Sequence, residues 1–319
     1  MHYNEIIQKP FIDAGFDVVY QPSCLHRPYT GKSWTIHYPE INWTDNTLVL
    51  MHCQDFVNVD NDMSIDLLNI EHYFGERAAQ VVVIVWNLSI PYNGPLNIIY
   101  FPTHSYELLT ELQKTQHMWG SGLLNERNLN WQCLNGTIKP HRINVAHYLR
   151  DNFSNGILSL HNEIPLDGLE YSIHYSWDNV KNWELLQPVY THCRTNIVTE
   201  TMYSSQTNIV TEKTLMALLA LQVPIVIGHK GVIAECQILG FDMFDDLVDI
   251  SYDYYSDEIR WHRAIELNKH IINGMFDYNI LKDRLYANQD YVLNQWPKKL
   301  VEQFNNNARD IALHLRQLT

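Results

Sequence analysis

The sequence has few positive charges and no long apolar run. Its 319 residues include 22 Lys and Arg against 36 Asp and Glu, which gives a formal net charge of −14 at pH 7. Non-specific binding of nucleic acid needs Lys and Arg to displace counterions, so the negative net charge disfavours a nucleic-acid-binding function. No apolar segment approaches the roughly 20 residues of a membrane-spanning helix. The start of the chain lacks the basic and apolar regions of a secretory signal, so we expect a cytoplasmic protein.

Several motifs of common enzyme and metal sites are also absent. The sequence contains no Walker loop and no Gly-x-Ser-x-Gly elbow, which disfavours an NTPase and a serine hydrolase. Its 16 His residues form no HExxH motif and no paired Cys/His spacing, so we expect neither a metal nor another cofactor. The number of Cys is odd and no CxxC pair occurs, which indicates reduced, buried thiols at positions 24, 53, 133, 193 and 236.

Apolar strands alternate with helices in the first part of the chain. Hydrophobic residues make up 46% of the sequence, enough for a sizeable core. Short apolar or β-branched runs predict strands over 47–51, 79–86 and 97–101, and helical spacing predicts helices over 63–74 and 105–112. Nearly continuous apolar strands separated by helices are typical of a parallel sheet covered on both faces.

A second alternation follows a segment of different composition. Residues 116–130 hold two Gly and three Asn with little periodicity, and we interpret them as an interdomain connection. Beyond them the pattern predicts strands over 131–134, 157–160, 196–199 and 223–227, and helices over 140–152, 211–221, 232–239, 257–273 and 298–318.

The two alternations predict an α/β protein of two domains. We place an N-terminal Rossmann-like domain at residues 1–125 and a second one at 126–319, whose last helix could pack back on the first domain. In such folds a ligand binds outside the carboxyl ends of the strands. Two facing domains would therefore hold it in the cleft between them.

One strand-to-helix turn carries groups suited to a phosphate ligand. Thr211 can cap a helix whose first backbone N–H groups point toward an anion, and Lys213 adds a positive charge there. Glu212 is suited to accept hydrogen bonds from ribose hydroxyls. The same residues would also form an ordinary helix cap with an ion pair in the first turn.

A second turn joins another strand to a helix. Arg142 lies in the first turn of that helix, with Lys139 beside it and Asn135 at the end of the strand. The helix dipole disfavours a cation at this position unless an anion is present, which favours a bound phosphate. A solvated turn remains the alternative.

The second half of the chain resembles a known family. Glu200-Thr201, the run Asn208 to Lys213 and the run Leu218 to Val226 are similar to the donor-site motif of the fucosyltransferases that make α1,3 linkages. Gly240-Phe241 and the run Asp249 to Asp253 are also similar to glycosyltransferase-like proteins of phages and marine microbes. This second likeness would place the protein in the cytoplasm of a bacterial cell or a phage-infected host.

The resemblance implies a fold and a reaction. The family has the GT-B fold, which is two facing Rossmann-like domains, and it inverts the sugar linkage, uses GDP-fucose and needs no metal in its site. It implies that Glu212 holds the ribose, that Lys213 and Arg142 hold phosphate, and that Glu200 belongs to the donor site. The family has Asp and an aromatic residue where this chain has Asn208 and Ile209, so the base and the sugar of the donor stay open.

The first domain should supply the acceptor site and the general base. An inverting transferase needs a carboxylate or a His to take the proton from the acceptor hydroxyl. Asp55 follows an apolar strand and should emerge at the carboxyl edge of the sheet, so it is our first candidate, with Glu71 and His104 behind it.

The sequence is compatible with three functions. The first is a glycosyltransferase that moves a sugar from a nucleotide-sugar donor, with a GDP-sugar favoured, to a hydroxyl of a glycan. The second is a phage-type enzyme that glycosylates a hydroxymethylated DNA base, which the acidic charge disfavours. The third is a protein that binds a nucleotide sugar without catalysis.

Overall fold

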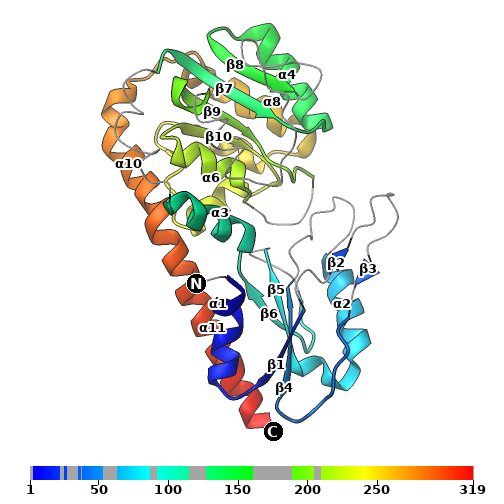
Figure 1. Cartoon of the computed structure of the whole chain (residues 1–319). Coiled ribbons are helices and arrows are strands. Elements are labelled where there is room, and N and C mark those ends of the chain that lie inside the picture. Colours follow the sequence, from blue (N-terminus) through cyan, green and yellow to red (C-terminus); the bar gives the residue numbers. More distant parts are fainter. Residues whose placement is uncertain are drawn as a thin grey trace. The chain divides into compact units, whose positions relative to one another are not determined.

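The chain forms two compact units, each with a four-stranded parallel sheet flanked by helices (Figure 1). The first unit comprises Met1–Glu107 and Pro297–Thr319, and the second comprises Leu108–Trp296. The protein is therefore α/β, as the alternating pattern predicts. The boundary predicted between residues 125 and 126 lies outside the described part of the chain. This computed structural model describes residues 3–21, 25–26, 35–36, 38–52, 63–86, 92–114, 127–160, 189–204 and 210–318.

The sheet of the first unit has the strand order β1-β4-β5-β6. The two central strands are buried along their whole length, which explains their unbroken apolar sequences. Val49 pairs with Val81 in the register between them. A short antiparallel pair lies outside this sheet. The strands of the unit are β1 (Asp17–Gln21), β2 (Leu25–His26), β3 (Thr35–Ile36), β4 (Thr47–His52), β5 (Val81–Val85) and β6 (Asn97–Tyr100).

Helices cover both faces of this sheet. α2 packs Leu67, Ile70 and Phe74 against β4 and β5, while α1 and α11 lie on the other side (Figure 1). The helix and the strand that the sequence predicts over 63–74 and 97–101 are present. The helices are α1 (Tyr3–Asp13), α2 (Met63–Phe74), the 3-10 helix η1 (Gly75–Gln80) and α11 (Trp296–Leu318). The helix α3 (Thr103–Lys114) begins in the first unit and continues into the second, which starts at Leu108.

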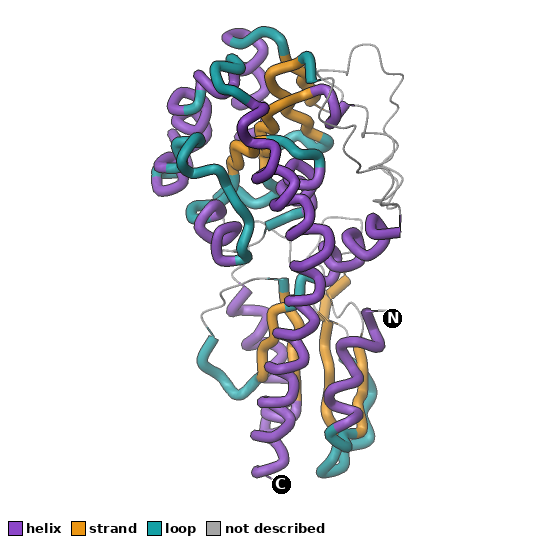
Figure 2. Tube along the Cα trace, turned by 90° about the vertical axis from the view of Figure 1, so that its left-hand side faces the viewer, coloured by secondary structure: helices purple, strands orange, loops and turns teal. Residues whose placement is uncertain are grey.

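The last helix, α11, is built into the first unit (Figure 2). Phe304 is fully buried and packs edge-on against Phe101, with 5.3 Å between the ring centroids. Arg316 donates hydrogen bonds to the backbone oxygen of Ala14 at 2.9 Å and to Oδ1 of Asn46 at 2.7 Å. These contacts join the helix to the end of α1 and to the turn before β4.

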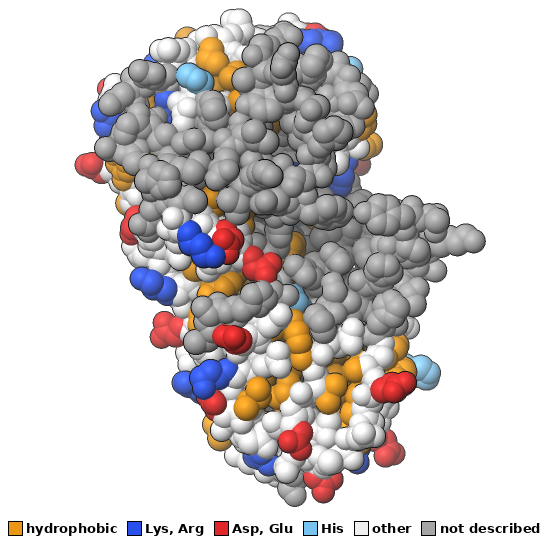
Figure 3. Space-filling model, in the orientation of Figure 1, with side chains coloured by type: hydrophobic (Ala, Val, Ile, Leu, Met, Phe, Trp, Pro, Cys, Tyr) orange, Lys and Arg blue, Asp and Glu red, His pale blue; other side chains and the backbone are white. Residues whose placement is uncertain are grey.

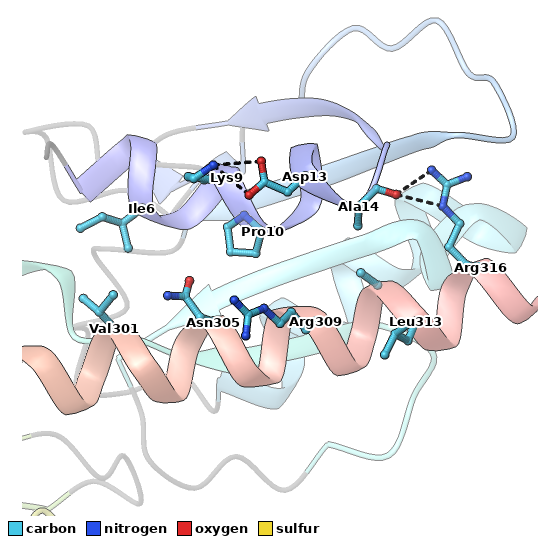
Figure 4. Close-up of a pocket in the computed structure, with 11 residues that line it drawn as sticks. Ile6, Lys9, Pro10, Asp13, Ala14, Val301, Asn305, Arg309, Leu313 and Arg316 are labelled. Carbon is cyan, nitrogen blue, oxygen red and sulfur yellow. Dashed lines mark hydrogen bonds and ion pairs between the residues drawn. The ribbon is translucent and has the colours of Figure 1, made fainter.

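A cavity of about 670 Å³ opens between α1 and α11 (Figure 4). Lys9 and Asp13 form an exposed ion pair at its edge, and Arg316 is held by backbone oxygens at one end. Apolar side chains line much of the rest, including Ile6, Pro10, Val301, Ala312 and Leu313. The charged side chains that line it are those of Lys9, Asp13, Arg309 and Arg316, and Lys9 is paired with Asp13. None of the described site residues predicted from the sequence lines this cavity.

The sheet of the second unit is wound in two directions. Its strand order is β10-β9-β7-β8, and all neighbours are parallel. The chain leaves β7 through α4 toward one edge, and it leaves β9 through α6 toward the other. Because such crossovers are right-handed, α4 and α6 cover opposite faces. The winding direction reverses between β7 and β9, and ligands bind at such a switch point in open α/β sheets. The elements are β7 (Leu129–Asn135), α4 (Pro140–Asn152), β8 (Gly156–Leu160), β9 (Cys193–Thr199), α6 (Glu212–Leu219) and β10 (Val223–Ile227).

The remaining helices of the second unit follow β10. The sequence predicts one helix over 257–273, but the structure divides it at Asn268 into α8 and α9. The Asn268 amide accepts a hydrogen bond from the Asp249 backbone N–H at 2.8 Å and donates one to the Asp249 oxygen at 3.0 Å. These contacts with a distant loop explain the interruption. The helices are α7 (Val232–Ile238), α8 (Asp257–Leu267), α9 (Lys269–Ile272) and α10 (Lys282–Asp290), with 3-10 helices η4 (Ser251–Tyr254) and η5 (Tyr278–Leu281) and the π-helix η6 (Tyr291–Gln295).

Candidate functional site

Three cationic side chains gather at the switch point of the second unit. Lys139 occupies the N-cap position of α4, where its side chain makes no capping hydrogen bond, and Arg142 lies in the first turn, shortly after β7. Lys213 lies in the first turn of α6, which follows β9. β7 and β9 are neighbouring parallel strands, so their carboxyl ends and both helix starts meet at one edge of the sheet. The structure therefore brings together the two turns that the sequence singles out.

Lys213 is held by the cap of its own helix. Its ammonium donates to Oε1 of Glu212 at 2.6 Å and to Oγ1 of Thr201 at 3.2 Å. Thr211 caps α6 as predicted, because its hydroxyl accepts from the Lys213 backbone N–H. The Lys213 and Glu212 side chains are 24% and 25% exposed, so both are accessible to a ligand. The cap and the first-turn ion pair expected from the sequence are therefore present together with the accessible charge.

Lys139 and Arg142 are anchored to the neighbouring strand. The Lys139 ammonium donates to the Thr201 backbone oxygen at 2.7 Å. Arg142 is buried and donates to the Thr199 oxygen at 3.0 Å and to the Thr137 hydroxyl. Each cation thus bridges the start of α4 to the end of β9.

The three cations are close enough to repel one another. Burial lowers the pKa of Lys139, and the charges of Arg142 and Lys213 lower it further. Crowded cations at the amino ends of two helices are electrostatically costly, since the helix dipole also places positive charge there. A bound anion would reduce both the repulsion among the cations and their repulsion by the helix dipoles. Backbone N–H groups at helix starts are also suited to bind an anion.

His141, which lies between Lys139 and Arg142 in the sequence, is neutral. Burial and the nearby Arg142 hold the pKa of His141 at about 4, so its imidazole is uncharged at pH 7. Its Nε2 lies 3.1 Å from the Glu200 backbone oxygen. Its ring stacks on Tyr203 with 4.5 Å between centroids, and the guanidinium of buried Arg260 lies over the Tyr203 ring. His141 therefore supports the turn by stacking and adds no further charge.

Two predicted site residues are fully engaged inside the fold. Glu200 has no exposed surface, and its carboxylate accepts hydrogen bonds from the loop after β9 and from the start of α6. Asn135 is also buried, and its amide donates to the Ser159 oxygen at 3.2 Å and accepts from the Thr199 hydroxyl. Both side chains connect elements around the site. Their predicted contacts with a donor stay predictions.

Several residues that build the site are not among the donor-binding residues predicted from the sequence. Thr214 donates from its hydroxyl to Oε1 of Glu200 at 2.6 Å, and Thr201, Tyr203 and Arg260 hold the loop after β9. Thr214 follows the Thr211 cap by three residues, which places both hydroxyls on one face of the helix. That spacing is the signal that could have identified it.

The candidates for a general base fall partly outside the described residues. Asp55 lies outside them, and so does the side chain of His104 in α3. Glu71 lies in the last turn of α2, where it accepts a hydrogen bond from the Tyr92 hydroxyl at 2.8 Å. The Leu96 backbone N–H donates to that hydroxyl just before β6 begins, so Glu71 lies near the amino end of the sheet. A base that serves the carboxyl edge must come from elsewhere.

His52, Trp86 and Thr103 meet at the carboxyl edge of the first sheet. His52 ends β4, and its Nε2 lies 2.8 Å from the Thr103 hydroxyl. Nε1 of Trp86, directly after β5, donates to the same hydroxyl at 2.9 Å. Burial lowers the pKa of His52 to about 4, so the ring is neutral at pH 7.

This His should make the first unit sensitive to acid. The unfolded chain takes up the proton near pH 6.5 and the folded chain only near pH 4, so stability is full above pH 6.5 and is lost as the pH falls toward 4. Between pH 7 and pH 5 we expect a loss of about 2 kcal/mol from this group. Urea denaturation at the two pH values measures it, and His52→Gln should reduce the loss. His72→Gln, at an exposed position of the same unit, should leave it unchanged. Equal losses in the two variants would contradict the assignment.

The described residues offer no alternative site based on a metal. No group of three or more His, Cys, Asp and Glu in that part of the chain could hold a metal ion. The expectation of a metal-independent site stays a prediction. Cys133, Cys193 and Cys236 are free, buried thiols.

Neither the surface charge nor the hydropathy of the described residues indicates a further function. Figure 3 shows Lys and Arg interspersed with Asp and Glu, and the described residues on this face form no basic area of the kind that nucleic acid needs. No helix within the described residues is long and apolar enough to cross a membrane.

Comparison with known proteins gives one similar structure. No protein-family model matches the chain, and no curated protein matches its sequence. A crystal structure of an α1,3-fucosyltransferase with GDP-fucose is similar at 16% sequence identity and a TM-score of 0.32. The alignment covers 91% of this chain and 74% of that chain. Function must therefore be inferred from the residues of the site.

Proposed function

We propose that this protein is a glycosyltransferase that takes a sugar from a nucleotide-sugar donor at the switch point of the second unit. One observation carries the proposal: Lys139, Arg142 and Lys213 converge there, at the amino ends of α4 and α6. Sugar transfer releases a nucleoside diphosphate, whose developing negative charge needs fixed cations and helix dipoles. The site offers both at one sheet edge.

Different residues of the site would bind the phosphates and the ribose of the donor. Lys213 and Lys139 would contact phosphate oxygens, and buried Arg142 would contribute its charge from behind the turn. Glu212, one quarter exposed beside Lys213, would accept hydrogen bonds from ribose hydroxyls. Thr211 holds the helix start in place.

The finer assignment follows the resemblance of the sequence. The proposed donor is a GDP-sugar, with GDP-fucose the first to test, and the proposed reaction is inverting and independent of a metal. The two units would face each other across a cleft in the GT-B arrangement, with the donor on the second unit. Asp55 of the first unit would take the proton from a glycan hydroxyl.

A panel of nucleotides tests this proposal by thermal shift. A ligand at about one hundred times its Kd stabilises the folded state by about 2.7 kcal/mol. For a unit of this size that raises Tm by roughly 5–10 °C. We expect GDP and GDP-fucose to produce the largest increase among GDP, UDP, ADP, GDP-fucose, GDP-mannose and UDP-glucose. No increase with any of them would refute the proposal.

Catalysis is tested separately from binding. Release of the nucleoside diphosphate from the donor should accelerate when a glycan acceptor is added. Binding of the donor without such release would identify a protein that only binds nucleotide sugars.

A further inference from the structure

The Glu200 carboxylate is the centre of a buried hydrogen-bond network. Oε1 accepts from the Thr211 backbone N–H at 3.2 Å and from the Thr214 hydroxyl at 2.6 Å. Oε2 accepts from the Thr201 backbone N–H at 3.3 Å and from the Thr211 hydroxyl. A carboxylate offers about four acceptor positions, so these contacts use its capacity.

This network fixes the position of the phosphate-binding lysine. Thr211 and Thr214 lie on either side of Lys213 in the first turn of α6, and both are tied to Glu200. Thr201, which accepts a hydrogen bond from the Lys213 ammonium, is tied to Glu200 by its backbone N–H. The carboxylate therefore holds the helix start and one partner of the ammonium in the same place.

The same strand end also fixes the other cationic turn. The Glu200 backbone oxygen lies 3.1 Å from Nε2 of His141, and the Thr201 oxygen accepts from Lys139. Gly228, after β10, passes so close that a Cβ on it would lie 3.2 Å from Cβ of Glu200. The starts of α4 and α6 are thus both held in position by contacts with Glu200 and its strand end.

We propose that Glu200 is a positioning residue that sets the geometry of the phosphate site through Thr211 and Thr214 without touching the donor. This inference rests on the proposed function. It assigns Glu200 a different role from Glu212: Glu200 has no exposed surface, whereas Glu212 is one quarter exposed and accessible to a ribose. The difference between the two acids can be measured with a ligand that has no ribose.

Inorganic pyrophosphate and GDP are the two probes, with Kd measured by calorimetry. Glu200→Gln places an amide group among hydrogen-bond donors, and Thr214→Val removes one hydroxyl of the network. Both variants should weaken pyrophosphate and GDP by a similar factor, roughly tenfold. Thr214→Ser keeps the hydroxyl and should restore wild-type binding. Glu212→Gln should weaken GDP without weakening pyrophosphate, because it removes a ribose acceptor and also frees the Lys213 ammonium from its ion pair.

Thr195→Val is the matched control. Thr195 is a fully buried residue of β9 whose hydroxyl has no hydrogen-bond partner among the described residues. Its replacement should leave both Kd values unchanged. Circular dichroism verifies that each variant is folded, and if Glu200→Gln does not fold, Thr214→Val and Thr214→Ser decide the test.

Two outcomes would overturn the inference. Wild-type pyrophosphate affinity in Glu200→Gln or Thr214→Val would show that the network does not set the phosphate site. A loss confined to GDP in Glu200→Gln would show that Glu200 acts on the nucleoside. A wild-type protein that binds neither pyrophosphate nor GDP would instead refute the phosphate site on which the proposed function rests.

Discussion

Replacement of Lys213 by alanine should remove most of the stabilisation that a nucleoside diphosphate gives this protein. The ammonium lies at the helix start with a quarter of its side chain exposed, and it adds the accessible charge at that end of α6. A hydrogen bond to a charged group contributes about 1.5–3 kcal/mol. The variant should therefore bind GDP roughly 10- to 150-fold more weakly. The thermal shift with GDP at fixed concentration measures the change.

Lys269→Ala is the control for this prediction. It removes the same charge from the same unit, but Lys269 is exposed on α9, which packs near the amino end of β7. Its thermal shift with GDP should match the wild type. If Lys213→Ala and Lys269→Ala responded alike, the anion site would have to lie elsewhere.

Truncation of Phe304 to alanine should destabilise the first unit by about 3–5 kcal/mol, which is typical for loss of a buried aromatic ring. Phe304 has no exposed surface and packs against Phe101 next to β6. The variant leaves a cavity between α11 and the sheet. Urea denaturation followed by circular dichroism and Trp fluorescence measures the change in the free energy of unfolding.

Leu313→Ala provides the comparison on the same helix. Leu313 is 63% exposed, so its truncation should change stability by less than about 0.5 kcal/mol. Similar denaturation midpoints for the two variants would contradict the assignment of α11 to the first core.

The sequence predicted the elements whose patterns are local. α2 and α4 have the predicted bounds, as does β10, because apolar spacing, a Pro in the first helical turn or a short apolar run defines each of them. The first helix and strand, α1 and β1, were not predicted. α1 contains Pro10 in its interior, and β1 has only half-buried and exposed residues, so neither carries a strong pattern.

Only part of the site could be read from the sequence. The sequence identifies four site residues because each lies at a strand-to-helix turn, and such turns can be recognised from the sequence alone. They are Lys139, Arg142, Thr211 and Lys213. The engagement of Glu200 was not visible, because it depends on the Thr214 hydroxyl and on the packing of α6 against β9. Hydrogen bonds between side chains of separate elements follow from the fold, so a strand-end acid alone does not reveal whether it faces a ligand.

The assignment of α11 to the first unit has a consequence for synthesis of the protein. A chain emerges from the ribosome N-terminus first. Residues 297–319 complete the first unit, yet they emerge after all of residues 108–296. The nascent first unit must therefore keep Phe101 without its Phe304 partner while the whole second unit is translated and free to fold.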